Sequence, residues 1–199
     1  NVLAKTKILN EIIVIDDGSK DDTGKILNKL SKKFKKIKYL KNKVNKGKAY
    51  SMDRGVKASN SDIIFFCDAD LRGLTPSIVE SIIKPVKDGK FDMFIGIRKN
   101  LMQRAVKKFA IDSGERALKK EIWEQLPSFY KHRFRIEEGL NHHVKHLKKG
   151  FGYKIFPYTQ TLKEVKYGFW KGMLSRWRMI LDIISADLYF YFFDEFFKK

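Results

Sequence analysis

Short apolar segments alternate with amphipathic segments along most of this chain, and this alternation constrains the fold more than any other feature. Apolar runs rich in β-branched and aromatic residues predict strands at 11–15, 37–40, 63–67, 92–97 and 153–158. Helical patterns lie between and after these runs, at 22–34, 47–58, 76–88, 118–126, 137–148 and 170–197. Because strands that alternate with helices form parallel sheets, the sequence predicts an α/β fold with a mostly parallel central sheet and helices on both faces.

The length and composition of the chain suit one main domain. It has 199 residues, of which 43% are hydrophobic, so it is long enough to bury a core. No Pro-rich or Gly-rich linker divides it. We place the main domain at 1–168 and treat 169–199 as an amphipathic, aromatic helical segment. Residues 100–112 are basic and amphipathic.

Acidic side chains follow two of the predicted strands at the point where each strand ends. Asp68-Ala69-Asp70 follows the run 63–67, and Asp16-Asp17 follows the run 11–15. In an open α/β sheet, ligands bind beyond the carboxyl ends of the strands. Carboxylate oxygens there could hold a hard divalent cation, which in turn could hold a diphosphate. Two solvated loop acids would give the same tripeptide, so the Asp-x-Asp pair needs support from elsewhere in the chain.

That support comes from a resemblance. Three motifs in this order are similar to those of the family 2 glycosyltransferases with the GT-A fold: Ile-Val-Ile-Asp-Asp-Gly-Ser-Lys-Asp-Asp-Thr at 13–23, Asn-Lys-Gly-Lys-Ala at 45–49 and Phe-Cys-Asp-Ala-Asp at 66–70. Three later segments resemble the polyprenyl-phosphate sugar transferases of that family, more loosely in the last case: Gly96-Ile97-Arg98, Ser113-Gly114-Glu115-Arg116-Ala117-Leu118 and Ile136-Glu137-Glu138-Gly139-Leu140-Asn141.

The resemblance implies an enzyme, a nucleotide-sugar-dependent hexosyltransferase, with a Rossmann-like GT-A domain. It implies a UDP- or GDP-sugar donor, a Mg²⁺ or Mn²⁺ ion, and inverting transfer to a lipid-linked or membrane-proximal acceptor such as a polyprenyl phosphate. The residues that it assigns to the donor are Asp16, Asp17, Lys46, Gly47, Lys48, Asp68 and Arg116. Asp68 and Asp70 would hold the metal, and Asp70 would also assist departure of the diphosphate.

Glu137 and Glu138 are the candidate catalytic residues on the acceptor side. An acceptor hydroxyl needs a base to take its proton as it attacks. A polyprenyl phosphate is already an anion and needs none, so the role of these glutamates depends on the acceptor. His142 and His146 could share a helix face, but no glutamate follows His142, and a catalytic zinc site is not favoured.

Two alternative functions fit parts of the sequence. One is a retaining transferase related to the glucosyl-phosphoglycerate synthases, which is expected to use a downstream histidine as a metal ligand; no histidine follows His146. The other is a degenerate, non-catalytic GT-A domain that docks to a membrane or a protein. Members of the family usually open with a strand that ends in a Pro-x-x-Asn-Glu loop. Here the chain starts at Asn1, within what looks like the following helix, and we expect it to be incomplete.

The net charge and the C-terminal segment indicate which kinds of partner the chain could bind. The formal net charge of +19 attracts anions, but lysine greatly outnumbers arginine, and nucleic-acid binding is not favoured. Residues 170–197 combine basic and many aromatic residues, and acidic residues interrupt them too often for a membrane span. They could lie in a membrane interface or pack on a protein surface. With a single cysteine and no visible signal peptide, we expect a cytoplasmic protein, peripheral to the cytoplasmic face of a membrane.

Overall fold

The computed structural model describes residues 2–99, 113–160 and 169–195, so the predicted basic segment 100–112 lies outside the described residues. The described strands are β1 (Ile12–Asp16), β2 (Ile37–Lys41), β3 (Ile63–Phe66), β4 (Leu71–Arg72), β5 (Met93–Arg98), β6 (Arg116–Lys119), β7 (Phe151–Phe156) and β8 (Thr159–Gln160). The described helices are α1 (Val2–Lys5), α2 (Thr23–Lys33), α3 (Lys48–Ala58), α4 (Pro76–Lys87), α7 (Lys120–Gln125), α8 (Arg135–Lys145) and α10 (Phe169–Tyr189), which continues as a π-helical turn, η1 (Phe190–Glu195).

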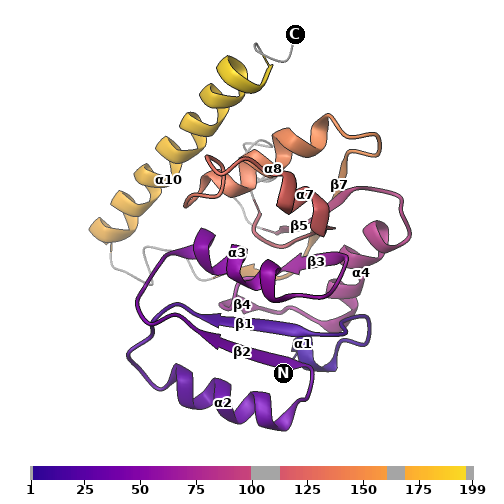
Figure 1. Ribbon diagram of the computed structural model, residues 1–199, viewed down its shortest axis with the longest axis vertical. Helices are drawn as coiled ribbons and strands as arrows, with labels where there is room; N and C mark the ends of the chain where they lie inside the picture. Colours follow the sequence, from indigo (N-terminus) through magenta and orange to yellow (C-terminus); the bar gives the residue numbers. More distant parts are fainter. Residues whose placement is uncertain (1, 100–112, 161–168, 196–199) are drawn as a thin grey trace.

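Within the described residues the strands form three sheets (Figure 1). β1 and β2 pair in parallel, with Ile12 opposite Ile37. A four-stranded sheet has the order β3-β6-β5-β7, in which β5 and β7 are parallel. β6 runs antiparallel to both of its neighbours. The short strands β4 and β8 form a separate antiparallel ladder. The predicted α/β fold is confirmed, with one reversed strand inside the larger sheet.

Helices cover both faces of the four-stranded sheet, and successive residues of β5 show this directly. Met93 and Ile95 pack in one core cluster with α3, α7 and α8, whereas Phe94 packs in a second cluster with α4. Side chains alternate between the faces of a strand, so a strand that is apolar throughout needs a helical layer on each side. The continuous apolar run at 93–97 is therefore explained by burial on both faces.

The start of the helix predicted at 118–126 was wrong, because residues 116–119 form strand β6 and the helix α7 begins at Lys120. The four residues of β6 are too few to show an alternating pattern, and one of them is the buried Arg116. Pairing on both sides, with β3 and β5, holds this segment extended.

The C-terminal helix α10 packs on α8 along one face and leaves the opposite face exposed. Ile183, Ala186 and Phe190 are buried, and the His142 ring stacks on Phe190 with centroids 4.0 Å apart. The exposed side chains form a stripe along the helix: Trp170, Leu174, Trp177, Leu181, Ile184, Leu188 and Tyr191. None of the helices in the described ranges combines the length and the apolar character needed to cross a membrane.

Candidate active site

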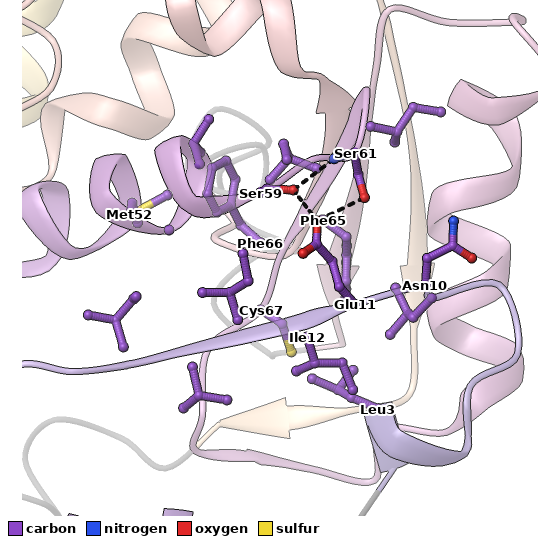
Figure 2. A pocket seen from close by; sticks show the side chains of 18 of the residues that line it. Leu3, Asn10, Glu11, Ile12, Met52, Ser59, Ser61, Phe65, Phe66 and Cys67 are labelled. Atoms are coloured by element: carbon purple, nitrogen blue, oxygen red, sulfur yellow. Dashed lines mark hydrogen bonds between the residues drawn. The ribbon is translucent and has the colours of Figure 1, made fainter. Parts of the chain in front are cut away.

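The carboxyl ends of β1 and β3 meet at one edge of the protein, where the acidic residues predicted from sequence come together. Asp17 follows β1, Asp68 follows β3, and Lys48 begins α3. All three line a cavity of about 840 Å³ between β1 and β3. Figure 2 shows other residues of its lining, among them Ile12 of β1 and Phe66 of β3. The sequence patterns at three separate strand and helix ends therefore belong to a single site.

Asp17 holds the loop that leads into α3. Its Oδ1 accepts hydrogen bonds from the backbone N–H of Lys46 at 2.8 Å and from Asn42 Nδ2 at 2.7 Å, and its Oδ2 accepts one from the N–H of Gly47 at 2.8 Å. Gly47 has a φ of 87°, a conformation that favours glycine. The Lys46 side chain is exposed. Asp17 therefore positions the backbone of the predicted nucleotide-binding loop.

Gly18, in the loop after β1, allows that loop to lie close to the loop before α3. A Cβ at position 18 would lie 2.8 Å from the backbone N of Asn45, and the residue has a φ of 79°. Both the close approach and the positive φ require glycine here.

Asp16 lies in a different environment from Asp17. Its carboxylate is fully buried and accepts hydrogen bonds from the Ser19 N–H at 2.8 Å and the Tyr39 hydroxyl at 2.9 Å, while Lys41 Nζ lies 3.9 Å away. The Asp16 carboxylate therefore contacts residues of the β1–β2 unit. Of the two aspartates predicted to contact the nucleoside, Asp17 is among the residues that line the cavity and Asp16 is not.

These hydrogen bonds predict loss of stability in acid. Burial alone would raise the pKa of Asp17, but the hydrogen bonds from Lys46, Asn42 and Gly47 outweigh it and lower the pKa below the ordinary 3.8. A carboxyl group with a lowered folded-state pKa stabilises the fold above its unfolded pKa and loses that contribution as the pH falls through the folded value. We expect the free energy of unfolding to drop below about pH 4. Urea unfolding of Asp17→Asn should show a smaller drop between pH 5 and 3 than the unchanged protein; an equal drop would contradict the prediction.

Lys48 joins the β3 end to helix α8. Its Nζ lies 2.9 Å from Glu137 Oε1 and 3.4 Å from Asp68 Oδ1. Burial alone would lower the pKa of Lys48, but the carboxylates of Glu137 and Asp68 outweigh it and raise the pKa, so the side chain is a cation. Glu137 is buried, and its Oε2 has no hydrogen-bond partner within the described part of the chain. A lysine predicted to line the nucleotide pocket thus connects a predicted metal ligand with a predicted catalytic residue.

Gln160, at the end of β8, contacts both aspartates of the Asp-Ala-Asp motif and was not predicted from the sequence. Its Nε2 lies 2.5 Å from Asp70 Oδ1 and 3.3 Å from Asp68 Oδ2. Rotating the amide by 180° would present its carbonyl oxygen instead. Two carboxylates and an amide oxygen are ligands that suit Mg²⁺ or Mn²⁺, so the residues present fit the predicted cation. No sequence signal marks Gln160, because it is 90 residues from Asp70.

A buried polar cluster lies behind Asp68 and was also missed. Glu115 is fully buried; its Oε2 accepts from Ser113 Oγ at 2.8 Å and from the Tyr158 hydroxyl at 3.3 Å. Burial raises the pKa of Glu115 despite the lowering effect of Arg98. The intervening Gly114 lies so close to Asp68, the predicted metal ligand, that a Cβ there would be 3.2 Å from Asp68 Oδ2. These hydrogen bonds hold the 113–115 backbone, which lies next to the Asp68 carboxylate.

Two predicted site residues face the interior instead. Arg116 is buried and donates hydrogen bonds to the backbone oxygens of Ser113 and Glu137, at 2.7 and 3.0 Å, which holds the start of α8 against β6. Glu138 is buried, and its Oε1 lies 3.3 Å from His142 Nε2. The same nitrogen lies 2.9 Å from Asp187 on α10. Consecutive residues of α8 therefore point in different directions, with Glu137 at the site and Glu138 toward the α8–α10 contact.

Comparison with known proteins identifies the family of this chain. A model of the glycosyl transferase family 2 matches residues 1–151. The dolichol-phosphate mannosyltransferase of Pyrococcus furiosus is 30% identical over 141 residues, which cover 65% of this chain and 39% of that protein. An uncharacterized protein of Methanocaldococcus jannaschii is 35% identical over 108 residues, which cover 50% of this chain and 47% of that protein. The chain thus spans less than half the length of these relatives.

The fold is also similar to solved structures. Glucosyl-3-phosphoglycerate synthase from Mycobacterium tuberculosis superposes with a TM-score of 0.68 and 20% identity, over 89% of this chain and 69% of that one. The predicted GT-A fold is thereby confirmed. With the family match over residues 1–151, these findings establish that the chain belongs to glycosyl transferase family 2.

Proposed function

We propose that this chain forms the donor-binding part of an inverting glycosyltransferase that moves a sugar from a nucleotide-sugar to a lipid-linked or membrane-proximal acceptor. The observation that carries the proposal is the convergence of Asp17, Lys48, Asp68 and Asp70 at the carboxyl edge of β1 and β3, where α/β sheets bind ligands. Solved complexes of the structural relative contain Mn²⁺ with UDP or UDP-glucose, which supports a divalent cation and a nucleotide-sugar.

Asp68 and Asp70, with Gln160, would hold the cation. When bound, a divalent cation acts as a Lewis acid that stabilises the negative charge of a departing diphosphate. Lys48 is the nearest cationic side chain to Asp68 in the described structure, and it offsets the charge of two carboxylates. Asp17 contributes by holding the Lys46–Gly47 backbone in place.

Glu137 is the residue that we assign to the acceptor side. Its Oε1 accepts a hydrogen bond from Lys48 Nζ, whereas its buried Oε2 makes no hydrogen bond within the described residues. This carboxylate is the base that we assign to a hydroxyl acceptor. With a phosphate acceptor no proton transfer is needed, and Glu137 would act only by orienting Lys48. One carboxylate base on the acceptor side would suit direct, inverting displacement by a hydroxyl acceptor.

The acceptor is proposed from the relatives and from the C-terminal helix. The Pyrococcus relative is named for transfer to dolichol phosphate, a membrane lipid. A dolichyl-phosphate beta-glucosyltransferase of Dictyostelium discoideum is 34% identical over 102 residues. The apolar stripe of α10 and the net charge of +19 would allow contact with an anionic membrane, at its cytoplasmic face.

Calorimetric titration with UDP- and GDP-sugars, each with Mn²⁺ and then with EDTA, tests the donor proposal. We expect metal-dependent binding of one nucleotide class, and slow release of free sugar when an acceptor is absent. Absence of binding to every donor, by a protein shown to be folded, would contradict the proposal and favour a non-catalytic domain.

Membrane contact through α10 gives a separate prediction. We expect the protein to bind anionic liposomes, to bind less as salt rises, and to lose most of this binding when residues 170–199 are deleted. Apolar burial and charge attraction act together at an interface, and the Debye length falls from about 10 Å at 0.1 M salt to about 3 Å at 1 M. Liposome flotation measures the bound fraction. Trp177→Gln removes apolar area from the exposed stripe and keeps the net charge; if this variant and the deletion both bind as well as the unchanged protein, the stripe is not the membrane contact.

A further inference from the structure

Three side chains of the types that bind metal ions converge where α8 packs on α10 (Figure 1). Glu138 and His142 lie four residues apart on α8, a spacing that places them on the same helix face. Asp187 comes from α10, 45 residues further along the chain. His142 Nε2 lies 2.9 Å from Asp187 Oδ1 and 3.3 Å from Glu138 Oε1. The three ligand atoms all lie within 4.8 Å of one another.

A proton on His142 Nε2 serves only one of these two carboxylates well. A ring nitrogen carries either one hydrogen or one lone pair, so it makes one good hydrogen bond. A metal ion that is bound by the lone pair would contact both carboxylates as well. Ligands held about 2.0–2.1 Å from zinc at tetrahedral angles lie about 3.3 Å apart. The distances of 2.9 and 3.3 Å at His142 Nε2 are close to this spacing.

Charge and burial at this position also suit a divalent cation. The side chains of Glu138, His142 and Asp187 are 7%, 13% and 17% exposed. Carboxylates with so little exposure need a compensating charge, and a divalent ion balances two of them while the imidazole stays neutral. The remaining exposure, which is largest at Asp187, gives an ion a route from solvent.

Neighbouring side chains fix the orientation of two of the three ligands. The His142 ring stacks on Phe190, with centroids 4.0 Å apart and the ring planes 7° apart. Glu138 Oε2 accepts a hydrogen bond from Asn141 Nδ2 at 3.4 Å, and Asn141 Oδ1 accepts one from the buried Arg116 at 3.1 Å. Contacts of this kind around metal ligands set the direction of the donor atoms. The arrangement therefore includes outer partners as well as the three ligands.

We propose that Glu138, His142 and Asp187 form a second metal site, separate from the Asp68–Asp70 site, which binds Zn²⁺ and joins α8 to α10. An imidazole nitrogen among the ligands favours a first-row transition ion over Mg²⁺, which prefers oxygen ligands throughout. A water molecule would complete four-coordination. The ion is structural, because its ligands come from two helices that meet only in the folded chain, and binding therefore stabilises the folded form.

Calorimetric titration of the full chain with Zn²⁺ tests the site, with Mg²⁺ in excess to occupy the Asp68–Asp70 site. We expect tight binding of a single ion, and an unfolding midpoint temperature that rises with the Zn²⁺ concentration. Asp187→Asn and His142→Gln should each weaken Zn²⁺ binding by at least about 10- to 100-fold, the loss that follows changes in outer partners alone. Both replacements are similar in size and polarity, and circular dichroism checks the fold.

His146→Gln is the matched control, because His146 ends α8 one turn after His142 and also contacts Phe190, but is not one of the three ligands. This variant should keep the Zn²⁺ affinity of the unchanged protein. Loss of binding in His146→Gln, with none in Asp187→Asn, would mean that Zn²⁺ binds a pair of histidines on one helix, and would overturn the proposal. Loss of Zn²⁺ binding in Asp70→Ala would place the ion at the donor site and overturn it equally.

Co²⁺ in place of Zn²⁺ gives a spectroscopic readout that does not depend on activity. The visible absorption of four-coordinate Co²⁺ should appear with the unchanged protein and with His146→Gln, and be lost in Asp187→Asn. If Asp187→Asn and His142→Gln fail to fold, the midpoint temperature of the unchanged protein still decides, since no rise with Zn²⁺ contradicts the site. A folded protein that binds neither ion tightly would show that the three side chains form a hydrogen-bonded cluster only, and the proposal would be wrong.

Discussion

Replacing Asp70 with alanine is expected to abolish the Mn²⁺-dependent part of nucleotide binding while leaving the fold intact. Asp70 lies beyond β3, and its carboxylate contacts the Gln160 amide together with Asp68. Removing one of two carboxylates takes away a charged ligand that a hard cation requires, and the remaining amide and single carboxylate hold the cation much less tightly. Calorimetric titration of nucleotide with Mn²⁺ and with EDTA, and circular dichroism for the fold, provide the measurements.

Asp62→Ala is the matched control for this experiment. Asp62 is exposed and lies at the opposite, amino end of β3, so its removal should leave metal-dependent binding unchanged. Nucleotide affinity that is the same for Asp70→Ala and the unchanged protein, with and without EDTA, would show that the Asp-Ala-Asp motif does not hold the cation.

Replacing Lys48 with methionine should reduce both stability and donor affinity. The ammonium group lies between Glu137 and Asp68, at 2.9 and 3.4 Å, and Glu137 is buried. In Lys48→Met the buried Glu137 carboxylate loses the ammonium group as a partner, which should lower the free energy of unfolding by about 1–3 kcal/mol. Two uncompensated carboxylates would also repel a diphosphate. Loss of one charge-assisted hydrogen bond, about 1.5–3 kcal/mol, corresponds to roughly a 10- to 100-fold loss in donor affinity.

Lys46→Met separates this effect from a general loss of positive charge. Lys46 lies two residues earlier in the same loop, its side chain is exposed, and it contacts Asp17 through its backbone N–H, which methionine retains. Urea unfolding and nucleotide titration of both variants give the comparison. Equal losses in the two variants would mean that Lys48 acts only through long-range charge, and no loss in either would contradict its placement in the donor site.

The strand ends were predictable because the signals that mark them are local. A run of apolar residues followed by aspartate defines both the strand at 12–16 and the strand at 63–66, and the carboxyl ends of parallel strands share one edge of a sheet. The sequence alone therefore determined that Asp17 and Asp68 would lie near each other. Gly18 and Gly47 both have a positive φ, which favours glycine at these loop positions.

Only the tertiary structure decided which of these residues contact each other and which partners they have. Lys48 meets Glu137 across 89 residues of sequence, and Gln160 meets Asp70 across 90, distances at which no local pattern carries information. The structure also separated Asp16 from Asp17 and Glu138 from Glu137, because neighbouring residues on a strand or a helix point in different directions. In the tertiary structure β6 runs antiparallel to its neighbours, and β1 and β3 do not pair with each other but lie on either side of a cavity. Strand pairing depends on how the whole chain packs and not on the composition of any one segment.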